Sequence, residues 1–433
     1  MTRRFSLAAR DTFRSLHVRN FRLFFSGQLI SQVGNWLTLI AQTLLVLHLT
    51  KNGLGVGLLT AFQFAPVLFL GPWAGLVADR SDKRRLLLIV QSLAMGQSFL
   101  LAALAFSGHP PVAAIYGVAM LGGFTMAFDN PARRAFVVEM VPQADASNAV
   151  SLNSALMTSS RVVGPALAGL LVSTVGFGWA FLADGLSYLA VLAGLYLMRT
   201  SELHPAPATP RGKGQVRDGL RYARRMPDLW VPLVMMAVVG TLAFNFQTVI
   251  PLFNRRDLHG TDATFTLIFS VISVGSLVGA LATARRKTIE VHHLVVASAG
   301  FGAAMLALAA VPNLAAAFPV GFFVGLGSIA FLTASTAIVQ VRADPSMRGR
   351  VLALQAMLFL GSTPIGGPIL GAICDTLGAR SGLIVGGAAA LGAAAWGRVA
   401  HRAKLQATDR LLVDEDKSGA PPAAIAHEPL LSR

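Results

Sequence analysis

Twelve stretches of about twenty or more mostly apolar residues follow one another along the chain, separated by short polar loops. At a helical rise of about 1.5 Å per residue, each can cross the roughly 30 Å hydrocarbon layer of a bilayer. By residue number the stretches are 21–49, 54–78, 86–107, 111–130, 148–175, 178–198, 229–253, 263–284, 291–311, 315–339, 350–376 and 380–400. Backbone that crosses lipid must satisfy its own hydrogen bonds. The sequence therefore predicts an all-α integral membrane protein with twelve transmembrane helices.

The scarcity of charge excludes a soluble enzyme. Only 13% of the 433 residues are charged and 54% are hydrophobic, whereas about a quarter of a soluble domain is charged. These charges are too few to cover the surface of a soluble domain of this length. The single cysteine, Cys374, excludes an intramolecular disulfide and a cysteine metal cluster. We expect neither a metal nor another cofactor.

The positive charges define an orientation. A formal net charge of +16 would suggest nucleic acid in a soluble protein, but basic loops also orient membrane spans. Of the 36 Lys and Arg, 31 fall on the side of the two termini and four on the other side. This predicts a multi-pass inner-membrane protein with both termini in the cytoplasm and no nucleic-acid partner. The basic loops also suit acidic membrane lipid, although topology alone explains them.

The first span is expected to be retained. It follows a basic arm without a small-residue cleavage site, so it is predicted to be a transmembrane helix and not a signal peptide. The loop at 199–228 then divides the chain into halves of six spans. The predicted organisation is a cytoplasmic arm (1–20), an N-terminal six-helix bundle (21–198), a cytoplasmic linker (199–228), a C-terminal six-helix bundle (229–400) and a disordered cytoplasmic tail (401–433). The Gly-Pro run at 164–169 echoes that at 367–372, which indicates parallel repeats.

The loop after the second span carries the sharpest motif. It runs from Gly75 through Asp79 and Arg80 to Arg84 and Arg85. Gly-x-x-x-Asp-Arg followed by a basic trio resembles the loop motif of the major facilitator superfamily, although Asp82 stands where many members carry glycine. The resemblance implies a V-shaped pair of bundles around a central cavity, lined mainly by the first and fourth helices of each half.

The resemblance also implies a gate on the cytoplasmic side. In such proteins the motif aspartate, here Asp79, holds that gate closed. Its partners would be the start of the eleventh helix, near Met347 to Arg350, and the basic end of the fourth helix at Arg133 or Arg134. Asp79 is therefore expected to act in gating and not in substrate contact.

A second block covers the fourth and fifth spans. Pro-Ala-Arg-Arg-Ala-Phe at 131–136 is followed by Arg161-Val-Val-Gly164-Pro165-Ala-Leu-Ala-Gly169. Glycine and proline inside an apolar helix permit close packing and flexing. The Gly-Pro-x-x-x-Gly run is similar to the fifth-helix motif of antiporters, and the combination resembles the subfamily that contains the enterobactin exporter and macrolide efflux proteins. This resemblance favours export over uptake.

Ionisable residues inside the spans are candidates for function, because a charge in lipid is costly. Arg161 and Asp184 fall at depths that differ by a few ångströms. A structural salt bridge is one reading; the other is that Arg161 receives an anionic substrate group, or that the pair opens on protonation. Asp129 and Asp375 lie near helix ends, where capping or headgroup contact is expected. Asp129 and Asp184 are the candidates for proton coupling.

Polar residues of the first span form one helical stripe, comprising Gln28, Gln32, Asn35, Thr38 and Gln42. A polar stripe in lipid must face protein or water, so it serves either helix packing or substrate contact, and we favour contact. The candidates for lining the substrate cavity are Gln28, Gln32, Asn35, Tyr116, Phe124, Arg161, Asn245, Gln247, Thr333 and Gln340. Such a cavity suits a sizeable, mostly apolar molecule with hydrogen-bonding groups.

The leading hypothesis is a monomeric secondary exporter that exchanges a small-molecule substrate for protons. A phosphate-binding Gly-x-x-x-x-Gly-Lys-Ser/Thr run is absent from the sequence, so ATP is not the expected fuel. An uptake symporter and a lipid transporter of the same fold are the alternatives. A membrane-embedded enzyme is a remote one, because the sequence lacks His-Glu-x-x-His and a buried histidine pair.

Overall fold

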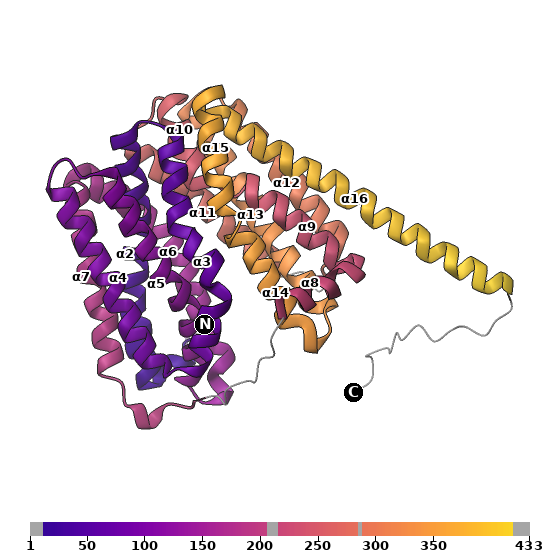
Figure 1. Ribbon diagram of the computed structural model, residues 1–433, viewed down its shortest axis with the longest axis horizontal. Coiled ribbons are helices and arrows are strands. Elements are labelled where there is room, and N and C mark those ends of the chain that lie inside the picture. The colour runs from indigo at the N-terminus through magenta and orange to yellow at the C-terminus, as the bar shows by residue number, and fades with distance from the viewer. Residues whose placement is uncertain (1–11, 206–214, 285–287, 419–433) are drawn as a thin grey trace, which may run out of the picture.

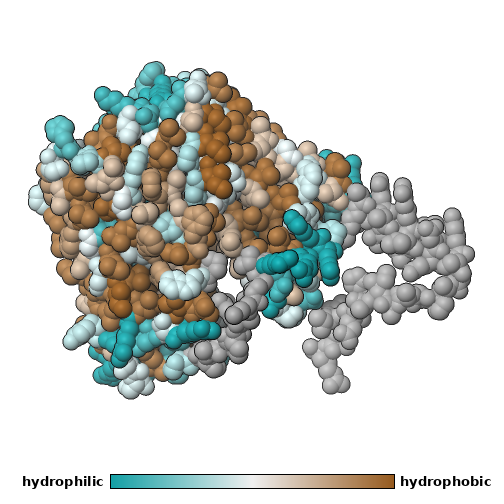
Figure 2. Space-filling view, viewed as in Figure 1, coloured by the Kyte–Doolittle hydropathy of each residue, from teal (hydrophilic) through white to brown (hydrophobic). Residues whose placement is uncertain are grey.

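The computed structural model describes residues 12–205, 215–284 and 288–418, and most of these residues are helical. Twelve segments within them are long and apolar enough to cross a membrane, as the sequence predicts. Figure 2 shows a hydrophobic band between hydrophilic ends of the molecule. Large apolar side chains such as Phe69 and Tyr196 are each 76% exposed. These exposed side chains suit contact with lipid.

The first half contains six long helices, with one-turn 3-10 helices at Arg14–His17 and Gln143–Asp145. The six are α2 (Arg19–Thr50), α3 (Gly53–Arg80), α4 (Lys83–Phe106), α5 (Val112–Glu139), α6 (Ala146–Thr174) and α7 (Phe177–Tyr196). Asp82, which replaces the glycine expected between the second and third spans, accepts the backbone N–H of Arg85 at 3.0 Å. The turn is therefore stabilised by an N-terminal cap of α4.

The second half contains eight helices for six spans, because two spans are each built from two helices. They are α9 (Pro227–Leu242), α10 (Phe246–Arg256), α11 (Asp262–Ala284), α12 (Val291–Ala310), α13 (Leu314–Arg342), α14 (Pro345–Leu360), α15 (Thr363–Leu377) and α16 (Ala379–Ser418). Continuous spans were expected at 229–253 and 350–376, so both interruptions differ from the prediction.

Both interruptions have local causes. Between α9 and α10, Nδ2 of Asn245 donates at 2.7 Å to the carbonyl oxygen of Thr241, four residues earlier. The side chain thus takes the place that a helical backbone N–H would occupy. Between α14 and α15, Pro364 stands in the first turn of α15, and proline has no N–H to continue the hydrogen bonds of α14.

The two halves lean together at one end. Figure 1 shows them meeting where α10 and α15 lie and diverging toward the end that carries α8 (Gln215–Arg225). Two seams join the halves, α3 against α15 and α6 against α11. In the first seam a Cβ added at Gly57 would overlap the carbonyl group of Gly367, and one added at Gly371 would overlap that of Gly53. Glycines therefore set the close approach of α3 and α15.

The segments outside the spans differ in part from expectation. Helix α8 and a short 3-10 helix at Thr200–Glu202 lie in the predicted linker. Helix α16 runs on to Ser418 and extends beyond the bundle (Figure 1). Residues 401–418 of the predicted disordered tail are thus described as part of this helix, and the disorder of the tail stays a prediction. Residues 1–11 of the predicted arm, 206–214 of the linker and 419–433 of the tail lie outside the described residues.

The seam of α3 and α15 can be tested with one methyl group. Gly57→Ala should lower the apparent thermal midpoint in detergent, because overpacking a tight contact costs about 1–3 kcal/mol. Gly300→Ala is the control, since a Cβ at Gly300 of α12 meets nothing within 4 Å. Alanine is also the better helix former, so that variant should keep or raise the midpoint. Equal midpoints for the two variants would contradict the close seam.

Candidate functional site

A cavity of about 470 Å³ lies between the two halves, with side chains of both in its wall. Its wall combines side-chain amides with aromatic rings, among them Gln63, Gln97, Trp36, Phe244, Phe269 and Phe359. The wall also contains nine of the residues that the sequence singled out, namely Gln32, Asn35, Thr38, Asp129, Arg133, Arg161, Asp184, Asn245 and Gln247. Both interrupted spans reach it, through Phe244 to Thr248 and through Phe359 to Thr363.

Five predicted cavity residues lie elsewhere. Gln28 is buried and accepts from Nε2 of Gln32 at 3.1 Å. Tyr116 donates to the carbonyl oxygen of Gly55 at 2.9 Å. Phe124 is 40% exposed, Gln340 is exposed, and Thr333 is partly buried outside the cavity wall. A polar or aromatic residue on a span does not reveal which face of the helix meets the cavity, so substrate contact by these five stays a prediction.

Asp184 is held by three hydroxyl groups from three helices. Oδ2 accepts from Thr38 of α2 and from Ser98 of α4, both at 2.7 Å, and Oδ1 lies 3.4 Å from the hydroxyl of Ser187. The residue is only 1% exposed. A Cβ at Gly34 would overlap Oδ1, so this glycine makes room for the carboxyl group. Hydroxyl groups both donate and accept, and they therefore suit a carboxyl group with or without its proton.

Asp129 is held differently, by a positive charge. Its Oδ2 lies 3.0 Å from the guanidinium of Arg133, one helical turn later on α5, and Oδ1 accepts from Gln91 of α4 at 2.7 Å. Arg133 also donates to Asn130 at 3.0 Å. The ion pair compensates both charges, which are costly to bury alone. Arg134, the other basic residue at this end of α5, is exposed.

Arg161 and Asp184 line the same cavity without forming the salt bridge that one reading of the sequence expected. The guanidinium of Arg161 instead lies over the ring of Trp36 on α2, 5.6 Å from its centroid. A Cβ at Gly164 would overlap Cβ of Trp36, so this glycine lets α2 approach. Within the described residues, the buried Nε of Arg161 has no hydrogen-bond partner. The similar depth expected from sequence therefore does not make the two side chains partners.

The motif loop fastens three helices at the diverging end. Arg84 donates to the carbonyl oxygens of Leu195 at 2.7 Å and Tyr196 at 3.1 Å, which are unsatisfied at the end of α7. Lys83 pairs with Glu139 of α5 at 2.7 Å. The loop therefore anchors α4 to α5 and α7.

The residues of the predicted gate lie near the ends of α3, α5 and α14. Gly75 and Asp79 lie near the end of α3 and are partly buried, and Arg80 is exposed. Arg350, near the expected partner stretch on α14, lies 3.8 Å from Asp218 of α8. Arg133 forms its ion pair with Asp129. The gating role of Asp79 stays a prediction.

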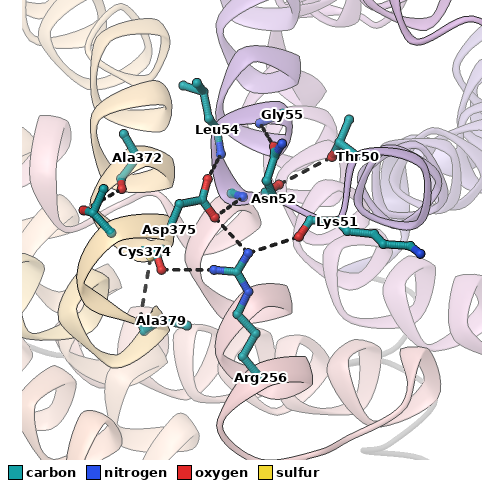
Figure 3. A network of polar contacts seen from close by, with 12 residues as sticks. Thr50, Lys51, Asn52, Leu54, Gly55, Arg256, Ala372, Cys374, Asp375 and Ala379 are labelled. Atoms are coloured by element: carbon teal, nitrogen blue, oxygen red, sulfur yellow. Dashed lines mark hydrogen bonds and ion pairs between the residues drawn. The ribbon is translucent and has the colours of Figure 1, made fainter.

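At the end where the two halves meet, a network of polar contacts joins α3, α10 and α15 (Figure 3). The sequence did not predict this network. Asp375 of α15 accepts the backbone N–H groups of Gly53 at 2.7 Å and Leu54 at 2.8 Å, in the first turn of α3. Arg256 of α10 donates to Asp375 at 2.8 Å and to the carbonyl oxygen of Lys51 at 3.1 Å. We name these contacts the Asp375 latch. Asp375 was expected to cap a helix; here it caps one in the opposite half.

Known proteins resemble the chain over most of its length. Staphyloferrin A transporter of Staphylococcus aureus is 25% identical over 362 residues, covering 82% of this chain and 90% of that protein. Macrolide efflux protein A of Streptococcus pyogenes is 20% identical, covering 85% and 92%. A solved bacterial homologue of the human lysosomal transporter Spinster, in an inward-facing and unoccupied conformation, is similar with a TM-score of 0.70. It is 15% identical and covers 89% of this chain and 97% of that chain, so it supports the fold alone.

The family model described as transmembrane secretion effector matches residues 10–429. This match spans nearly the whole chain and confirms the resemblance carried by the loop motif. The twelve apolar spans and the cavity between two halves agree with it. The protein is a membrane transporter and not an enzyme, and it belongs to the transmembrane secretion effector family of the major facilitator superfamily.

Proposed function

We propose that this protein is a secondary active exporter. It moves a sizeable, largely apolar molecule of the siderophore or drug-like class out of the cytoplasm by alternating access, in exchange for protons. The observation that carries the proposal is a cavity walled by both halves, with the Asp375 latch crossing between the halves at one end. Two relatives are named for staphyloferrin A transport and for macrolide efflux.

The direction of opening follows from charge. Among the described residues, Lys83, Arg84 and the arginines of α8 lie at the diverging end, so this end faces the cytoplasm under the positive-inside rule. The arrangement described here is then the cytoplasm-facing one, in which an exporter loads its cargo. Release requires the halves to rock, so that the latch breaks and the diverging end closes.

The cavity wall supports a cargo of mixed character. Trp36, Phe244 and Phe359 offer aromatic surface, while Gln32, Asn35 and Asn245 offer hydrogen bonds. The buried Nε of Arg161 is a donor that a cargo oxygen can accept from. A cavity of about 470 Å³ suits a drug-sized ligand, and larger cargo would extend through the diverging end.

Asp184 is the better candidate for the proton carrier. Asp129 keeps a guanidinium 3.0 Å away, and removal of the carboxylate charge would leave Arg133 buried and uncompensated. Within the described part of the chain, the side-chain hydrogen-bond partners of Asp184 are hydroxyl groups, so gaining a proton would not leave a cation without its partner. Asp184 also lines the cavity, so bound cargo can contact its carboxyl group.

The function is tested by flux in inside-out membrane vesicles with an acidic interior. We expect a member of a panel of siderophores, macrolides and cationic dyes to accumulate inside, and a protonophore to abolish the accumulation. Accumulation only in right-side-out vesicles would instead mean uptake by symport. Movement of fluorescent phospholipid between leaflets, without transport of the panel, would mean a lipid transporter.

Asp184→Asn separates coupling from transport. The amide keeps the size and one acceptor oxygen but cannot carry a proton, so gradient-driven accumulation should fall to background while downhill exchange of cargo continues. Asp129→Asn is the comparison, and it should retain dependence on the pH gradient. Gradient-driven accumulation at the wild-type level in Asp184→Asn would rule this residue out as the carrier.

The Asp375 latch is tested by a distance measurement between the halves. Asp375→Asn removes the ionic contact with Arg256 and weakens the cap on α3, worth about 1–3 kcal/mol, so the open-to-closed ratio at this end should rise about 5- to 150-fold. Spin labels at exposed Trp179 and Leu377, one in each half, report the separation.

A matched control removes another cap from the same helix end. Asn52 accepts the N–H of Gly55 at 2.7 Å but belongs to the same half as α3 (Figure 3). Asn52→Ala should therefore leave the label distances unchanged. If both variants shift the distances alike, fraying of α3 and not the contact between halves is responsible.

A further inference from the structure

Helix α8 carries its arginines on one face. The exposed Arg217, Arg221, Arg224 and Arg225 fall within an arc of about 100° at 100° per residue. The opposite face packs on the protein: Ala223 is fully buried, and Gly219 lies against Arg350 of α14. We propose that the arginine face of α8 binds the headgroups of anionic phospholipids in the leaflet that surrounds this end of the protein.

The helix is fixed in place, so its arginine face has a defined direction. The hydroxyl of Tyr222 donates to Oδ2 of Asp344 at 2.9 Å and accepts the backbone N–H of Asp344 at 3.1 Å. Asp218 lies 3.8 Å from Arg350. Both contacts join α8 to the start of α14. A rigidly held row of cations loses little conformational freedom on binding.

The depth of α8 matches the headgroup layer. Only Met226 separates α8 from α9, the first helix of a membrane span. Trp230 stands in the first turns of α9, and Trp is enriched at the membrane–water interface. The guanidinium of Arg224 lies 5.3 Å from the centroid of the Trp230 ring. The arginine face therefore begins at the level of an interfacial residue; Figure 2 shows a hydrophilic patch beside the hydrophobic band where Figure 1 places α8.

Charge and spacing favour lipid over other anionic partners. Orientation of the spans requires positive residues in this loop but no particular spacing between them. Positions 217, 221, 224 and 225 repeat with helical period, and their face is opposite to the packed one. Arginines beside a membrane span meet anionic headgroups at high local concentration. A soluble acidic protein would have to compete with that surface.

The test compares amide hydrogen exchange of residues 215–225 in nanodiscs of phosphatidylcholine with exchange in nanodiscs containing about one third phosphatidylglycerol. The anionic lipid should slow exchange several-fold in the wild type. Arg217→Gln/Arg221→Gln should abolish the difference between the two lipids, and Arg217→Lys/Arg221→Lys should keep most of it. Equal thermal midpoints in detergent check that the variants are folded.

A matched control lies on another helix at the same end. Arg398 and Arg402 of α16 are also exposed and four residues apart, so Arg398→Gln/Arg402→Gln removes the same charge with the same spacing. The lipid effect on 215–225 should persist in this variant. Three results would overturn the proposal: equal exchange in both lipids for the wild type, loss of the effect in the control variant as well, or protection by soluble polyglutamate but not by phosphatidylglycerol.

Discussion

Lipid offers the backbone no hydrogen bonds, and this constraint decides where the chain departs from a regular helix. Both interruptions in the second half occur where the spans reach the cavity, at Asn245 and at Thr363. At the first interruption, the side-chain amide of Asn245 donates a hydrogen bond to the carbonyl oxygen of Thr241. Irregular backbone at this depth is tolerated only where protein or a cavity covers it, and in transporters such breaks accompany the binding site. The breaks therefore support the cavity as the place where cargo binds.

The same constraint explains how three charged groups are tolerated inside the bundle. Asp129 is neutralised by a cation, Asp184 is solvated by hydroxyl groups, and Arg161 lies on an aromatic face. In the first case, loss of the carboxylate charge would leave a buried cation uncompensated, whereas hydroxyl groups can donate to or accept from a carboxyl group. A carboxyl group that must gain and lose a proton needs the second kind of surroundings. Asp184 and Asp129 thus have different capacities although both line one cavity.

Sequence could predict what depends on one helix at a time. Length and hydropathy gave the twelve spans, and three- and four-residue steps placed Gln32 and Asn35 toward the cavity. Contacts between helices that are far apart in the chain could not be predicted from the sequence. Equal depth suggested a bridge from Arg161 to Asp184, but depth carries no information about direction around the axis. Asp375 was recognisable as a cap, yet the helix that it caps lies over 300 residues away. The breaks in two spans depended on neighbours as well.

The two seams between the halves contain the same kind of contact. In one seam a Cβ at Gly169 of α6 would overlap the hydroxyl of Thr266 on α11; in the other, a Cβ at Gly367 of α15 would overlap the hydroxyl of Thr60 on α3. Each threonine hydroxyl donates at 2.8 Å to the carbonyl oxygen three residues earlier in its own helix, so neither seam is tied by a side-chain hydrogen bond from that hydroxyl.

Matching seams of this kind suit a rocking motion. Glycine brings the helices close, and a hydroxyl satisfied within its own helix allows them to slide without stranding a polar group in an apolar layer. The α6–α11 seam also has a hydrogen bond, from the hydroxyl of Ser270 to the carbonyl oxygen of Val162 at 3.3 Å. The Asp375 latch adds an ion pair and two backbone hydrogen bonds at one end of α3 and α15. The seams thus set how closely the halves approach, and the polar contacts at their ends set which end is closed.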